Sequence, residues 1–198
     1  MHTFPTSRPV QIVPYQSQWP QDFAVLKTQL QEAFGPLAQQ IDHIGSTSVP
    51  GLAAKDIIDI QVSVTDLQAP ALADLLTQLE ASHSYRVRRD LQDELTGLPE
   101  DSPELKKYFI ATLPPQRAAN IHIRQIGKQN QRYALLFCAF LRENPAETQV
   151  YSLLKQRMAT LFPESIEGYL YIKDPLMDLL YLQAEHWAKR TAWRSSHA

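Results

Sequence analysis

The chain has 198 residues, 44% of them hydrophobic, and its 19 basic and 21 acidic side chains give a formal net charge of −2. This length suits one compact domain with a sizeable buried core, and the balanced charge argues against a polycation that binds nucleic acid. The single cysteine, Cys138, excludes an internal disulfide and a zinc site built from several cysteines.

The N-terminal segment, residues 1–9, has the composition of a loose arm. The first fifteen residues lack the apolar core of a signal peptide, and no stretch approaches about 18 consecutive apolar residues. We therefore expect a soluble, cytoplasmic protein that makes no membrane contact. Residues 10–15 are rich in β-branched side chains and predict a short strand or extended lead-in, which Pro14 would place at a sheet edge.

The first predicted helix opens at Trp19-Pro20, because proline suits the first turn of a helix. Gly35-Pro36 ends it. Between these points large apolar residues recur at helical spacing: Phe23, Leu26, Leu30 and Phe34. We expect these side chains to pack in the core.

Residues 41–64, IDHIGSTSVPGLAAKDIIDIQVSV, open with a turn that could hold an anion. Gly45 permits a sharp bend, the hydroxyls of Ser46, Thr47 and Ser48 can donate to phosphate oxygens, and Lys55 adds a positive charge. The alternative is that these residues only end a strand and that Pro50-Gly51 forms a β-turn. The spacing matches neither a Walker A loop nor a dinucleotide-binding fingerprint.

The second half of this stretch is the clearest alternating pattern in the sequence. Ile58, Ile60, Val62 and Val64 fall on one face of a predicted strand. Asp59, Gln61 and Ser63 fall on the other face. With a rise of about 3.3 Å per residue, Asp59 and Gln61 would stand roughly 6.6 Å apart, so both could reach one ligand.

Residues 70–82 predict a second amphipathic helix, and residues 85–87 a short strand. The charged segment 88–107 carries Gly97, Pro99 and Pro103 and predicts a long surface excursion. Such an excursion is either a lid or binding loop, or simply a solvated insertion.

Two further strands are predicted at residues 108–113 and 120–124. In the second, NIHIR, alternation places Asn120, His122 and Arg124 on one polar face, which we expect to lie beside Asp59 and Gln61. Segment 108–131 contains no carboxylate. His122 could bind a metal such as Mn or Zn together with Asp59, or it could hydrogen-bond Asp59 as a structural pair.

From residue 132 the pattern is helical to the end of the chain, with a break at Asn144-Pro145. The helix after this break is predicted to turn one apolar row inward: Val150, Leu153, Leu154, Met158 and Leu161. The last helix is predicted over residues 175–192, preceded by Lys173, which could face the anion site or cap a helix C-terminus. Cys138 is predicted to be a buried packing residue rather than a nucleophile.

The stretch HIGSTSVPGLAAKDIIDI resembles the signature of the GrpB family. Further similarity lies in VPYQSQWPQDF, NIHIR, FCAFLRENP and YIKDPLMDLLYLQAEHWA, so the resemblance covers nearly the whole chain. It implies a nucleotidyltransferase-like fold, in which a Gly-Ser turn and strand carboxylates hold a nucleotide triphosphate and divalent metal ions. Gly45, Ser46 and Asp59 match that pattern, but Gln61 stands where a second carboxylate belongs. Cys138-Ala139 replaces an Arg-Asp pair typical of the family.

These observations predict a single α/β (α+β) domain over residues 1–198, with loose ends at 1–9 and 190–198. A nucleotidyltransferase-like mixed sheet would be flanked by N- and C-terminal helices. The expected ligand is a nucleotide or other phosphorylated small molecule at Gly45, Ser46, Thr47, Ser48 and Lys55. Asp59, Gln61 and His122 are the candidate catalytic residues, and Asp59 and His122 the candidate ligands of a divalent metal, Mg or Mn. Nucleotidyl transfer is one hypothesis; the other is a catalytically degenerate protein that binds the ligand without turnover.

Overall fold

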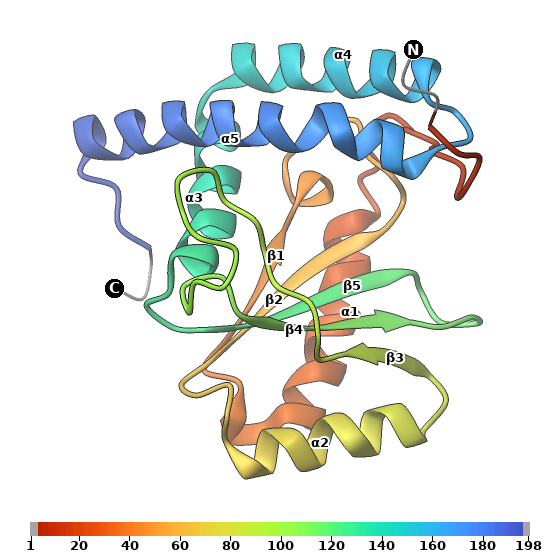
Figure 1. Cartoon of the computed structure of the whole chain (residues 1–198), viewed down its shortest axis with the longest axis vertical. Helices are drawn as coiled ribbons and strands as arrows, with labels where there is room; N and C mark the ends of the chain where they lie inside the picture. Colours follow the sequence, from red (N-terminus) through yellow and green to blue (C-terminus); the bar gives the residue numbers. More distant parts are fainter. Residues whose placement is uncertain (1–3, 196–198) are drawn as a thin grey trace.

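The computed structural model describes residues 4–195, which form one mixed sheet with helices on both faces (Figure 1). The strands lie in the order β1-β2-β5-β4-β3. Their bounds are β1 Gln40–Ile44, β2 Ile58–Val64, β3 Tyr85–Arg88, β4 Lys107–Thr112 and β5 Ala119–Gln125. The helices are α1 Trp19–Phe34, α2 Pro70–Ala81, α3 Gln129–Glu143, α4 Pro145–Leu161 and α5 Ile166–Thr191. The predicted fold class is therefore confirmed.

The centre of the sheet is the parallel pair β2 and β5, with antiparallel strands on either side. Asp59 lies opposite Asn120 and Gln61 opposite His122, so the two polar strand faces are neighbours, as predicted. The intervening residues of β2 and β5 point to the opposite face and are buried: Ile58, Ile60, Val62, Val64, Ile121 and Ile123. One face of the sheet is therefore an apolar core surface and the other carries polar groups.

Helices α1 and α2 cover the apolar face. Pro20 lies in the first turn of α1, and Gly35, with a φ of 51°, ends this helix. Its buried residues repeat at helical spacing: Trp19, Leu26, Leu30 and Phe34. The first predicted helix is confirmed in extent and in the face that it buries.

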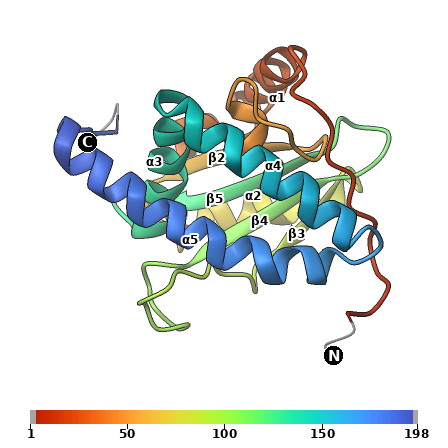
Figure 2. The same cartoon turned by 90° about the horizontal axis from the view of Figure 1, so that it is seen from above.

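Helices α3, α4 and α5 lie on the polar face, and Figure 2 shows α4 and α5 crossing above the sheet. The last helix begins at Ile166, not at residue 175 as predicted, so Pro175 and Lys173 lie inside it. The Ser165 hydroxyl accepts a hydrogen bond from the Gly168 N–H at 3.2 Å and caps this start. The start was predicted at Pro175 because proline is common in the first turn of a helix.

Helix α4 turns a different face inward from the one predicted. Val150, Leu153 and Leu161 are 59%, 46% and 72% exposed. Met158 is buried as predicted, but the other buried side chains of α4 are Thr148, Tyr151 and Lys155. This rotation brings a lysine and a tyrosine beneath α4, toward the polar face of the sheet.

A few residues near both ends of the described chain contact the helices, whereas residues 5–9 are exposed. The Phe4 ring lies 5.4 Å from that of Phe162, and the Val10 N–H donates to the Pro163 carbonyl at 2.8 Å. Residues 10–15 form only one isolated bridge, between Val13 and Ala54. At the other end Trp193 packs on the α3–α5 core, and the predicted loose residues 1–3 and 196–198 lie outside the described range.

The excursion between β3 and β4 is folded back over the polar face. Leu105 is buried, and a bridge joins Gln92 to Lys106. Part of segment 88–107 lines a cavity on the polar face, while most of its residues are exposed. Within residues 4–195, no helix has the length and apolar character needed to cross a membrane.

Candidate functional site

The candidate site begins with the turn after β1. Gly45 has φ 67° and ψ −172°, a conformation that is essentially restricted to glycine. A Cβ atom at this position would lie 2.4 Å from Asp59 Oδ2. Ser46–Ser48 then form a single 3₁₀ turn, and the Ser48 hydroxyl donates to the Gly45 carbonyl at 2.8 Å. Gly45 therefore permits both the bend and the close approach of Asp59.

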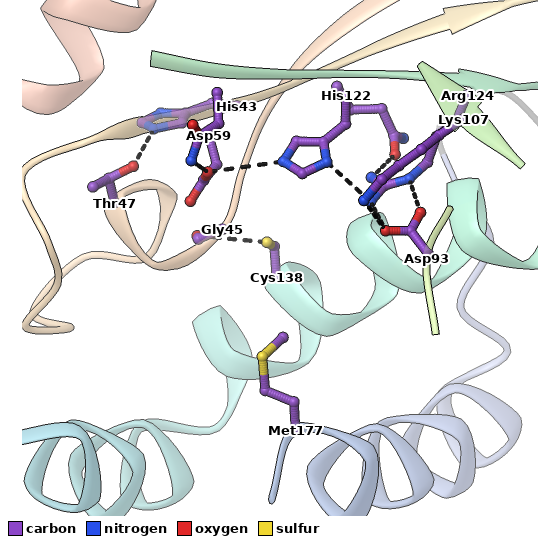
Figure 3. Close-up of polar contacts among 12 residues, drawn as sticks. His43, Gly45, Thr47, Asp59, Asp93, Lys107, His122, Arg124, Cys138 and Met177 are labelled. Carbon is purple, nitrogen blue, oxygen red and sulfur yellow. Dashed lines mark hydrogen bonds and ion pairs between the residues drawn. The ribbon is translucent and has the colours of Figure 1, made fainter. Parts of the chain in front are cut away.

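Helix α3 and strand β1 hold this turn in place (Figure 3). The Cys138 thiol lies 3.7 Å from the Gly45 carbonyl, and Arg142 Nε donates to the Ser48 carbonyl at 3.0 Å. His43 Nε2 lies 2.9 Å from Thr47 Oγ1, and its ring stacks on Phe23. Cys138 is buried, as predicted, and burial raises the pKa of its thiol, which disfavours the nucleophilic thiolate.

Asp59 stands between the turn and β5. Its Oδ1 accepts a hydrogen bond from Asn120 Nδ2 at 3.0 Å, and His122 Nε2 lies 3.9 Å from the same oxygen. Burial tends to raise the pKa of Asp59, but His122, Asn120 and Lys55 outweigh it and hold this pKa below its usual value. Asp59 is therefore a carboxylate at neutral pH.

His122 is neutral at pH 7, because burial lowers its pKa to about 4 despite the nearby Asp59. Its Nδ1 lies 3.4 Å from the guanidinium of Arg124, which can only donate. This contact assigns the ring proton to Nε2, the atom that faces Asp59. In that tautomer the Nε2–H of His122 faces Asp59 Oδ1 across 3.9 Å, beyond hydrogen-bond distance, and Nε2 has no lone pair for a metal.

The Gln61 side chain is completely buried. Its Nε2 donates to the Gln131 carbonyl at 3.2 Å, and its Oε1 accepts from Arg124 at 2.8 Å. Both ends of the amide are thus used within the protein. Gln61 positions Arg124 rather than lining the cavity.

A buried ionic network extends from Arg124 to the excursion. Arg124 donates two hydrogen bonds to Asp93, at 2.8 and 3.1 Å, and Lys107 pairs with the same carboxylate. Asn130 Nδ2 also donates to Asp93, at 3.1 Å. Burial would raise the pKa of Asp93, but Arg124 and Lys107 hold it far below its usual range. Asp93 is fully engaged and fixes the excursion to the sheet.

These elements line an open cavity of about 800 Å³ between the sheet, α3, α4, the excursion and the first half of α5. Of the predicted site residues, the cavity brings together Gly45, Ser46, Thr47, Lys55, Asp59 and His122. Ser48 and Gln61 are turned into the surrounding structure. The cavity is also lined by Lys155 and Lys173. Sequence reasoning missed Lys155, because it interrupts an apolar helical pattern and looks like a surface residue there.

The side chains of the cavity fit a metal ion only in part. In the described part of the chain no group of three or more His, Cys, Asp or Glu residues could hold one. Asp59 offers one carboxylate, whereas Gln61 and Asp93 are committed to Arg124. Mg²⁺ commonly binds through one or two carboxylates together with substrate phosphates. Asp59 therefore fits a single ion shared with a phosphorylated ligand, and the residues present do not fit two.

Comparison with curated proteins finds relatives over nearly the whole chain. A protein named dephospho-CoA kinase from Mycolicibacterium paratuberculosis is 32% identical over 200 residues, covering 94% of this chain and 48% of the relative. The UPF0157 protein YqkA of Bacillus subtilis is 31% identical over 188 residues, covering 95% of this chain and 50% of the relative. The chain therefore spans about half the length of these two proteins.

Among solved structures, the conserved protein GrpB from Enterococcus faecalis superposes with a TM-score of 0.73 at 30% sequence identity. This match covers 89% of the present chain and 99% of the other. The family model described as GrpB protein matches residues 9–182, which include the turn, Asp59, the excursion and both lysines of the helical wall. The chain therefore belongs to the GrpB family.

Proposed function

We propose that the cavity binds a nucleotide or another phosphorylated small molecule, with a phosphate at the Gly45-Ser46 turn. One observation carries this proposal: the turn, the Asp59 carboxylate and the Lys55 side chain all line the same cavity of about 800 Å³. A volume of this size accommodates a small organic ligand, since ligand pockets span about 300–1,000 Å³.

The chemistry of the turn suits phosphate oxygens. Ser46 and Thr47 supply hydroxyl groups beside a tight backbone bend, and Lys55 supplies a compact positive charge. Asp59 Oδ2 lies directly against Gly45, so a phosphate on the turn would meet a negative neighbour. A divalent metal, Mg or Mn, held by Asp59 and by the ligand's own phosphate oxygens, would neutralise both charges. Asn120 would then orient Asp59 through its hydrogen bond to Oδ1, with the Nε2–H of His122 facing the same oxygen.

Binding without turnover is the function that this geometry favours, and nucleotidyl transfer is the second candidate. Transfer is supported by the placement of Asp59 against the turn. It is disfavoured by the shortage of carboxylates, because phosphoryl-type transfer depends on electrostatic stabilisation and commonly on two metal ions. The relatives named dephospho-CoA kinase lend support to a nucleotide-type ligand, although this chain corresponds to only half of their length.

Calorimetric titration with ATP, GTP and CTP, with and without Mg²⁺ or Mn²⁺, tests the proposal. We expect at least one nucleotide to bind, and the metal to raise its affinity at least tenfold. Asp59→Asn should abolish the metal effect, because an amide is a weaker, neutral ligand. Asp74→Asn, an exposed change on α2 on the far side of the sheet, should keep it.

If the metal still raises nucleotide affinity in Asp59→Asn, Asp59 is not a metal ligand. Absence of binding by all three nucleotides would overturn the nucleotide proposal. Release of pyrophosphate from the bound nucleotide, measured with a coupled assay, would decide for transfer over simple binding.

A further inference from the structure

Lys155 on α4 is the most unusual charged side chain of the cavity. It is 1% exposed, and its Nζ has no hydrogen-bond partner within residues 4–195. Its nearest interaction is with the ring of Tyr151, whose centroid is 4.8 Å from Nζ. A buried ammonium group without a hydrogen-bond partner is costly to the folded state. The position of Lys155 in the cavity wall indicates that a ligand supplies the missing partner.

Two other lysines line the same end of the cavity from different elements. Lys55 comes from the loop before β2, and its Nζ lies 6.0 Å from the centre of the Tyr169 ring. Lys173 comes from α5, and its Nζ lies 3.5 Å from the exposed carboxylate of Asp174. Three lysines thus converge from a loop and two helices.

The three charges are close enough to act on one another. The pKa of Lys155 is lowered to about 7, mainly by burial and also by Lys173 and Lys55, while Asp59 opposes this effect. Burial likewise lowers the pKa of Lys55, with Lys173 contributing. The tyrosines do not neutralise the cluster, because burial raises the pKa of both Tyr151 and Tyr169. Asp59 and Asp174 offset part of the positive charge of these lysines, but neither is a hydrogen-bond partner of Lys155 Nζ.

We infer that the lysine cluster, Lys55, Lys155 and Lys173, binds the linked phosphates of a diphosphate or triphosphate, with Lys155 Nζ donating to a phosphate oxygen. This inference rests on the proposed function and narrows its ligand class. A single phosphate carries about 1.5 to 2 negative charges, which one or two lysines can balance, whereas three lysines match a longer phosphate chain. Lysine suits this role as a compact charge with three donors.

The first test uses inorganic tripolyphosphate and orthophosphate as probes in metal-free buffer, so that Asp59 and its metal do not contribute. We expect tripolyphosphate to bind at least tenfold more tightly than orthophosphate. Lys155→Met should reduce tripolyphosphate affinity at least tenfold. Lys189→Met, which removes an equal charge from an exposed site near the end of α5, should change it less than twofold. Equal affinities for the two probes, or an unaffected Lys155→Met protein, would overturn the inference.

The second test separates a ligand contact from a merely structural lysine. A bound polyanion favours protonated Lys155, so binding near pH 7.5 should take up protons, detected by titration in buffers of different ionisation enthalpy. Asp59, Lys55, Tyr169 and Lys173 also face Lys155, but the uptake assigned to Lys155 should disappear in Lys155→Met. Folding of this variant is checked by its melting temperature, which should not fall, because methionine removes the unpartnered buried amine and keeps the unbranched chain up to Cε.

The two proposals fail in different ways. If neither nucleotides nor tripolyphosphate bind, the proposed function itself fails. If ATP binds in an Asp59-dependent manner but no more tightly than AMP, and Lys155→Met binds ATP normally, only the lysine inference fails. Tighter binding of ATP than of AMP, lost in Lys155→Met, would support both.

Discussion

At the scale of single residues, Gly45 sets the distance between the turn and Asp59. Its backbone conformation is one that a side chain at this position would strain, and the space for a Cβ is already occupied by the Asp59 carboxylate. Gly51, in the following turn, also has a positive φ, of 79°, but nothing lies within 4 Å of a Cβ placed there. A comparison of substitutions at these two glycines therefore distinguishes the cost of backbone strain from the cost of a clash with Asp59.

We expect Gly45→Ala to lower the free energy of unfolding by at least about 2 kcal/mol, because strain and displacement of Asp59 add. Gly51→Ala should cost about 1 kcal/mol, from strain alone. Denaturant unfolding of both variants measures the difference. Equal losses would mean that the approach of Asp59 to Gly45 contributes nothing to stability.

The residues of the candidate site were predictable from the sequence to different degrees. Asp59 and His122 were assigned to adjoining strand faces because strand side chains alternate strictly. The direction of the Gln61 amide was not predictable, because it depends on Arg124 and on a carbonyl of α3. Asp93 was missed for a related reason: its partners come from β4 and β5, far from it in sequence.

At the scale of elements, most strands and helices were predictable to within a few residues, but the start of α5 and the inward face of α4 were not. Apolar spacing in α4 favoured burial of Val150 and Leu153, and the structure exposes both. Helical periodicity identifies an apolar stripe on a helix. It does not show whether tertiary contacts bury that stripe. Here the cavity side of α4 carries Tyr151 and Lys155. Both side chains have polar atoms, so an apolar pattern does not predict their burial.

The attachment of the excursion to the rest of the fold can be tested by single substitutions, because a few named side chains hold it. It is held on the sheet by Asp93 and on α5 by Asp178, which accepts hydrogen bonds from the Thr96 N–H, at 3.1 Å, and the Thr96 hydroxyl. Glu104 adds a third point through Lys128, at 2.9 Å. Loss of one attachment should loosen the nearest part of the segment and leave the sheet intact.

We therefore expect Asp178→Ala to increase amide hydrogen exchange in residues 94–100 about tenfold or more, since hydrogen bonds to charged groups contribute about 1.5–3 kcal/mol. Exchange in β2 and β5 should be unchanged. Asp174→Ala, one turn earlier on α5, serves as the control and should leave residues 94–100 as protected as in the wild-type protein. Equal effects of the two variants would show that Thr96 and Asp178 do not hold the excursion.

At the scale of the whole molecule, stability should depend on pH through buried histidines. The pKa of His43 is lowered from 6.5 to about 4, chiefly by burial and also by Arg142. Since the unfolded chain binds a proton at higher pH than the folded one does, stability falls as pH falls from about 6.5 to 4. The size of this contribution is about 2–3 kcal/mol.

His43→Gln should reduce the slope in that part of the profile, because the amide can still bond Thr47 but does not titrate, while His122 still contributes. His186→Gln, at an exposed position on α5, should give the wild-type profile. Urea unfolding at intervals between pH 7.5 and 4.5 measures the slopes. Parallel curves for wild type and His43→Gln would exclude His43 as a source of acid sensitivity.

The residues that line the cavity lie between Ile12 and Asp178 in the sequence. The cavity therefore exists only when the sheet, the excursion and the C-terminal helices are assembled. Any compound that fills it must favour the native state over the denatured ensemble as a whole. At a concentration of 100 times the dissociation constant this gain is about 2.7 kcal/mol, which raises the melting temperature by roughly 5–10 °C for a domain of this size. A collection of metabolites can therefore be screened by measuring the melting temperature of the protein with each compound, without any assumption about the reaction.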